Sequence, residues 1–158
     1  MKKELKQEFI LRITRANKTQ MVVILYDMVL TYLEDCLTAF EKEDYKEYKW
    51  NIDRAKECID ELLNSLHMEY EIAMNLKSLY FFYKRELTTA AIQQKKELVV
   101  PVIQMIQELK VSYEQAVASD TSAPIMQNTQ TVYAGLTYGK DRLNVSLSDQ
   151  GTSRGFRV

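Results

Sequence analysis

Glycine is confined to the carboxy-terminal end of this chain. Its four glycines all fall within the last 24 residues, from Gly135 onward, and residues 1–134 contain only two prolines, Pro101 and Pro124. Glycine and proline interrupt helices most strongly, and the part of the chain that lacks them carries apolar residues at steps of three and four. The sequence therefore predicts an all-α protein of long helices. A protein of this kind usually acts by presenting surfaces, and we expect no enzymatic activity.

Composition narrows the range of partners. With 158 residues the chain has the length of one domain plus a tail, and its 21 basic and 22 acidic side chains leave a formal charge of −1. This balance favours neither nucleic acid nor an anionic membrane. The longest apolar run, Met21 to Leu30, is interrupted by Asp27 and is shorter than the roughly 20 residues that cross a bilayer. We expect a cytoplasmic protein without membrane insertion, cofactor or small-molecule substrate.

The first long helix is predicted to begin at Asn17. The side chain of Asn17 can accept a hydrogen bond from the opening turn, and Gln20, three residues later, completes a capping box. The polar cluster at residues 41–44 is the predicted turn. A second helix is predicted from about Tyr45 to Leu66, because its apolar residues alternate at steps of four and three.

Two further helices follow in the predicted order. A third begins after a short connection near His67 and Met68. The fourth is predicted to start near Glu97 or Leu98, since Pro101 lacks the amide that interior turns require and fits only in the first turn. Connections this short make neighbouring helices run antiparallel. The predicted fold is an antiparallel four-helix bundle with an N-terminal arm and an extended C-terminal tail.

We predict two regions in the chain. Residues 1–118 form the helical-bundle domain, including the arm at residues 1–16, and residues 119–158 form a linker and a tail of low order. The arm contains Phe9 and Ile10, and is either an extra turn of helix or a strip that lies in an apolar groove when no partner is bound. The tail carries more apolar residues than a purely solvating segment needs, and we predict that they fold back on the bundle.

The cysteines and the histidine, residue types that often form catalytic or metal sites, give little support for such a site here. Cys36 and Cys58 are out of register on the predicted hairpin, so both are interpreted as reduced packing residues. A di-iron bundle needs two histidines, and the chain has one, His67. A phosphotransfer role for His67 is disfavoured because Glu69 and Glu71 would repel a phosphoryl group.

Four short segments, one on each predicted helix, carry a family resemblance. They are Leu25-Tyr26-Asp27, the run from Asn51 to Leu62, Asn75-Leu76 with Leu79-Tyr80, and Glu108-Leu109-Lys110 before Tyr113. In this order and spacing the sequence resembles the flagellin-specific secretion chaperones, the FliS proteins. The resemblance implies a cytosolic protein that binds the C-terminal segment of flagellin. It also implies that the protein prevents premature polymerisation of flagellin and delivers it to the flagellar type III export gate.

The resemblance also suggests where the client binds. The expected groove residues lie on the first and third predicted helices, and each has plain core packing as its alternative: Tyr26, Val29, Leu33, Leu76, Leu79, Tyr80 and Tyr83. Leu25, Ile52 and Ile59 are expected in the core. Phe9 and Ile10 of the arm are expected either to occupy the groove in the free protein or to contact the export gate. We also predict that the tail is an internal occupant of the groove.

A second function remains open at this stage. The family usually has a small residue after the Tyr-Asp pair, where this chain has Met28. The tail of this chain is also longer than that of most members. These departures leave open an alternative, in which a bundle of the same fold serves another client or regulatory partner.

Overall fold

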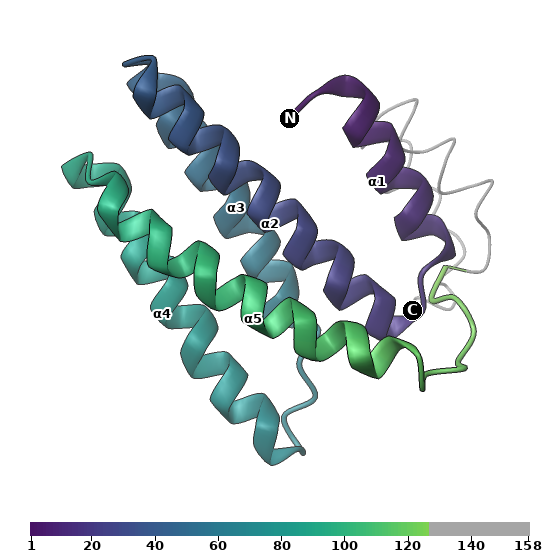
Figure 1. Ribbon diagram of the computed structural model, residues 1–158. Coiled ribbons are helices and arrows are strands. Elements are labelled where there is room, and N and C mark those ends of the chain that lie inside the picture. Colours follow the sequence, from purple (N-terminus) through teal and green to yellow (C-terminus); the bar gives the residue numbers. More distant parts are fainter. Residues whose placement is uncertain (127–158) are drawn as a thin grey trace, which may run out of the picture.

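The computed structural model describes residues 1–126, and these residues are all-helical, as predicted. Figure 1 shows helices α2, α3, α4 and α5 packed side by side, with α1 lying along α2. Helix α2 contacts α3 and α5, and α4 also contacts α3 and α5, so the four helices enclose one core. The bounds of the helices are α1 (Lys3–Arg15), α2 (Lys18–Glu41), α3 (Tyr45–Asn64), α4 (Glu71–Gln93) and α5 (Val99–Val117), with a 3-10 turn at Lys96–Leu98.

The predicted start of the first long helix is confirmed. Asn17 is the N-cap of α2: its side chain accepts a hydrogen bond from the Gln20 amide at 2.9 Å, and the Gln20 side chain accepts one from the Asn17 amide at 2.9 Å. The turn at residues 41–44 is also confirmed, with Asp44 capping α3 through the Glu47 amide at 3.0 Å. Glu43 takes the left-handed conformation at a φ of 58°, which is unusual without glycine.

Other helix boundaries differ slightly from the prediction. Helix α3 ends at Asn64, two residues before Leu66, because Ser65 turns the chain and its hydroxyl donates to the Leu62 carbonyl at 2.7 Å. Helix α5 starts at Val99 after the 3-10 turn, so Pro101 lies in its first turn as predicted. The arm is a separate helix of 13 residues, longer than the predicted extra turn. The tail from residue 127 onward lies outside the described residues.

Tyrosines fill much of the core. Tyr26, Tyr48, Tyr80 and Tyr83 are among the largest side chains that are fully buried. Three of the four hydroxyls have partners inside the protein: the Tyr48 hydroxyl donates to the Ala90 carbonyl of α4 at 2.9 Å, and the hydroxyls of Tyr26 and Tyr80 lie 2.5 Å apart. Buried hydroxyls require such partners, because an unpaired one costs about 1 to 3 kcal/mol.

Both cysteines are unpaired and buried, as the sequence predicted. Leu25, Ile52 and Ile59, which were expected in the core, also belong to the main cluster of buried residues. Burial raises the pKa of the Cys36 and Cys58 thiols to about 12, so little reactive thiolate is present near neutral pH. Within residues 1–126 no helix is long and apolar enough to cross a membrane.

The bond between Tyr48 and Ala90 gives a test of the core. Replacing Tyr48→Phe removes the donor and leaves the Ala90 carbonyl buried without it, so the free energy of unfolding should fall by about 1 to 3 kcal/mol. Urea denaturation followed by circular dichroism measures this change. Tyr45→Phe, at a less buried position in the same helix, is the control and should change stability by less than about 0.5 kcal/mol. Equal stabilities of the two variants would contradict the assigned role.

A candidate binding groove between α2 and α4

The main candidate site is an apolar groove at the end of the molecule where α2 and α4 begin. Its volume is about 550 Å³, and its walls come from α2, the connection between α3 and α4, α4, α5 and the segment after α5. The apolar and aromatic side chains of its lining are Met21, Val22, Leu25, Leu66, Tyr70, Ile72, Ala73, Leu76, Tyr80, Tyr113 and Ile125. Pockets of this volume, lined mainly by apolar groups, are typical binding sites.

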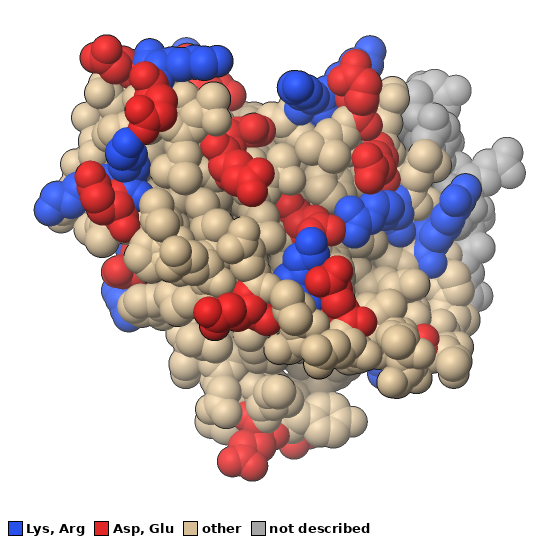
Figure 2. Space-filling model, viewed as in Figure 1, with Lys and Arg blue, Asp and Glu red and all other residues tan. Residues whose placement is uncertain are grey.

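Exposed apolar side chains gather at the connection between α3 and α4 and at the start of α4, and two of them, Tyr70 and Ile72, line the groove. Tyr70, Ile72 and Met74 have exposed fractions of 61%, 63% and 62%, and Met68 is also exposed. Figure 2 shows mostly uncharged surface at the lower end of the molecule, where Figure 1 places the start of α4, with acidic side chains at its tip. A contiguous set of large exposed apolar residues usually marks an interaction site.

The floor of the groove is formed by Tyr80 and Tyr113, and both contact the fully buried Tyr26 of α2. The hydroxyl contact between Tyr26 and Tyr80 joins α2 to α4, and the Tyr113 ring of α5 packs edge-on against Tyr26 at 5.6 Å between ring centroids. Burial raises the pKa of all three phenols, so they stay neutral at physiological pH. The floor is therefore an uncharged surface, and the Tyr80 hydroxyl in it is paired with that of Tyr26.

The structure places the predicted groove residues in two environments. Leu76 and Tyr80 line the groove and, at 5% and 1% exposed, also belong to the main core cluster. Tyr26, Val29, Leu33 and Tyr83 belong to the same core cluster, each at most 1% exposed, and do not line the groove. Leu79 is half-buried and packs against the core. The wide apolar stripe of α2 has a structural cause, since α2 contacts α1, α3 and α5 on different sides.

Several lining residues were missed by the sequence reasoning. Ile72 was not among the expected groove residues, yet its side chain is largely exposed and lines the groove. Leu25 was expected in the core; it is buried there and also contributes to the groove wall. Ile125 lies beyond the predicted bundle. Spacing along one helix cannot show which of its turns a neighbouring helix covers.

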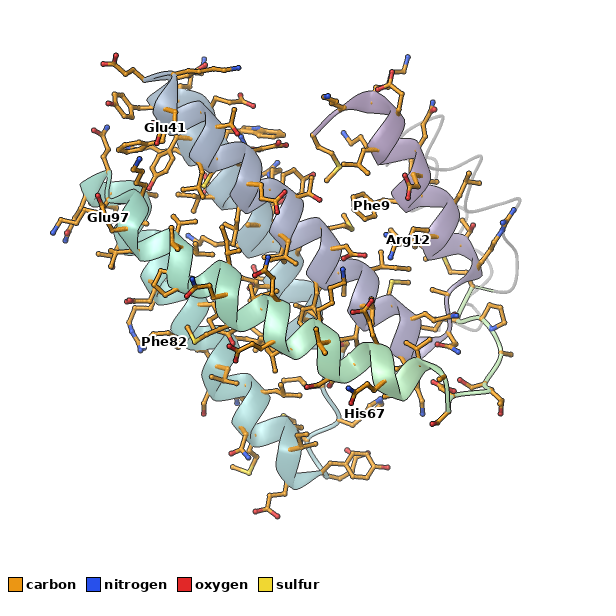
Figure 3. All side chains as sticks on the ribbon, in the orientation of Figure 1. Phe9, Arg12, Glu41, His67, Phe82 and Glu97 are labelled. Atoms are coloured by element: carbon orange, nitrogen blue, oxygen red, sulfur yellow. The ribbon has the colours of Figure 1, made fainter. Side chains whose placement is uncertain are left out.

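The arm covers another apolar part of α2. Phe9 is buried against Ala16 and Ile24, while Ile10 is half-buried. The Arg12 guanidinium donates to the Asp27 carboxylate at 2.7 Å and also lies over the Phe9 ring, 5.4 Å from its centroid; Figure 3 labels both side chains on α1. Asp27 also pairs with Lys110 of α5 at 2.6 Å. One carboxylate thus links α1, α2 and α5.

His67 lies at the rim of the groove in an exposed position. Its ring nitrogen Nδ1 is 3.8 Å from the Glu69 carboxylate. This acidic neighbour would repel a phosphoryl group, in line with the argument from the sequence. The arrangement gives no positive support for phosphotransfer at this histidine.

Comparison with known proteins identifies the family. The sequence model of one family, described as Flagellar protein FliS, matches residues 1–120. The chain belongs to the FliS family. A curated relative is the flagellar secretion chaperone FliS of Bacillus subtilis (strain 168), which is 21% identical over 108 residues, covering 68% of this chain and 81% of that protein. The family match spans α1 to α5 and confirms the resemblance seen in the sequence, while residues 121–158 lie beyond it.

The shared carboxylate of Asp27 gives a test of how the arm is held. Replacing Arg12→Ala removes the ion pair between α1 and α2, which we expect to weaken docking by about 1 kcal/mol and to raise the undocked population of α1 about fivefold. Hydrogen exchange of the α1 amides measures this population. Arg15→Ala, on the same helix, should leave exchange nearly unchanged. If both variants exchange at the parental rate, the Arg12 pair does not hold the arm.

Proposed function

We propose that this chain is a cytoplasmic chaperone that binds the C-terminal helical segment of flagellin, prevents its premature polymerisation and delivers it to the flagellar type III export gate. Helices α2 to α5, acting as an antiparallel four-helix bundle, provide the binding surface. The observation that carries the proposal is the open apolar groove between α2 and α4 in a member of the FliS family. The Bacillus subtilis relative is a flagellar secretion chaperone, which supports the same proposal.

The groove suits one face of an amphipathic helix. Its apolar lining, which includes the exposed Tyr70 and Ile72, accepts the apolar side chains of that face. Covering the apolar face of a client segment removes the driving force for that segment to associate with its own kind. No covalent chemistry is needed for this function, so we propose that the protein is not an enzyme.

The arm has a related role in the proposal. In the free protein α1 covers Ile24 with Phe9, and the contact depends on a small apolar cluster and the Arg12 ion pair. We propose that a client segment replaces α1 on this face, so that the client follows two sides of α2. Because Phe9 is buried, we assign it to covering this face of α2 in the free protein. Contact with the export gate remains the alternative for the more exposed Ile10.

A substitution in the groove tests the proposal directly. Ile72→Ser removes a largely exposed apolar side chain from the groove lining, and the loss of its burial by the client, about 1.5 to 3 kcal/mol, should raise the Kd roughly tenfold or more. Isothermal titration calorimetry with the C-terminal segment of flagellin measures the Kd. The matched control is Ile92→Ser at the other end of α4, where the isoleucine is 73% exposed. Equal effects of the two substitutions would contradict a client site at the groove.

Another client is the alternative function. Met28 packs against both the main core and the cluster beneath α1, so this chain fills the arm interface with a larger side chain than the family usually has there. The two functions are separated by mixing the folded protein with flagellin on a sizing column. A stable 1:1 complex supports the flagellin chaperone, and the absence of a complex supports the alternative.

A further inference from the structure

The segment that follows α5 returns to the start of α2. We call residues 120–125 the return segment. The Asp120 carboxylate accepts hydrogen bonds from the Thr19 hydroxyl at 2.5 Å and from the Ser122 amide at 2.9 Å, and the Asn17 side chain donates to the Asp120 carbonyl at 3.3 Å. At its far end the Ile125 amide donates to the Ala16 carbonyl at 2.9 Å. The return segment is thus fixed at both ends to the start of α2.

The return segment brings the chain to the edge of the groove. The Ile125 side chain is part of the groove lining and is about half exposed. The hydrogen bonds to Asp120 lower the pKa of its carboxyl group to about 2, so the group stays charged, and able to accept them, throughout the physiological range. Residue 126 is the last that the structure describes, so the following 32 residues start beside the groove.

The sequence after Ile125 has the composition of a groove occupant. Residues 121–139 carry no charged side chain, although charged residues make up 27% of the chain. Entering an apolar groove therefore requires no charge to be taken out of water. The same stretch contains Val132, Tyr133, Leu136 and Tyr138. These residues lie 6 to 12 positions after Met126, and extended chain covers about 3.3 to 3.6 Å per residue, so any point of the groove is within reach.

We propose that residues 127–139 of this chain bind in the groove between α2 and α4 when no client is present. The tether sets a local concentration in the millimolar range, which favours this segment over a second copy of the chain at ordinary protein concentrations. A client must displace the segment. The apparent affinity of the chain for the client is therefore lowered by the fraction of chains whose groove is occupied. This last consequence rests on the proposed chaperone function, whereas occupation of the groove does not.

Thiol labelling of the full chain tests occupation without any client. Ile72→Cys places a reactive thiol in the groove lining, while the native cysteines are buried and react slowly. The labelling rate of this chain is compared with that of the same chain carrying the triple substitution Val132→Ser, Tyr133→Ser and Leu136→Ser, at positions outside the described residues. Labelling should become at least threefold faster with the triple substitution. Ile92→Cys, labelled in the same two backgrounds, is the control and should not change.

Two results would overturn the proposal. Equal labelling rates of the Ile72→Cys chain in both backgrounds would show that the segment does not cover the groove. Protection that increases with protein concentration would show that a second copy provides the occupant. Circular dichroism of each variant verifies that the helices are intact.

A separate titration tests the competition. If the segment competes with the client, the triple substitution alone should tighten binding of the flagellin C-terminal segment at least threefold, and unchanged affinity would contradict competition. If flagellin does not bind at all, the chaperone proposal fails while the labelling result still decides occupation.

Discussion

The contact between the hydroxyls of Tyr26 and Tyr80 is the interaction on which the groove depends. Helices α2 and α4 each pack against α3 and α5, and these two long side chains meet across the space between them. The phenol rings fill that space with apolar surface, and the hydroxyl pair satisfies both polar ends in a dry environment. Because the tyrosines close the core at this level, the groove has a firm floor. The first turns of α4 extend past this floor, which leaves Ile72 without a covering helix.

The start of α2 connects the three features that bear on function. Asn17 caps the helix and also holds the return segment through the Asp120 carbonyl, while the Ala16 carbonyl accepts the Ile125 amide. Ala16 and Asn17 also join α2 to the arm. A client that displaces α1 or enters the groove therefore acts next to this junction. The arm, the return segment and the groove therefore meet at the start of α2.

The sequence predicted the fold well because local chemistry determined it. The capping box of Asn17, the turn at residues 41–44 and the position of Pro101 each depend on residues close together in the chain. The site was harder to predict, since groove and core use the same apolar residue types and differ only in what covers them. Val29 and Leu33 are covered and Ile72 is not, although all three continue helical stripes. The Arg12 ion pair with Asp27 joins two helices, and no local spacing indicates it.

The open groove is the feature that a client must use if the chain is a flagellin chaperone. Titrating the isotope-labelled protein with the C-terminal segment of flagellin, and following methyl signals by NMR, locates the contact without altering a residue. We expect the methyl signals of Ile72, Leu76 and Leu25 to shift in proportion to the bound fraction, while that of Ile92 stays in place. Saturable binding that leaves the three groove signals unmoved would contradict the groove as the client site.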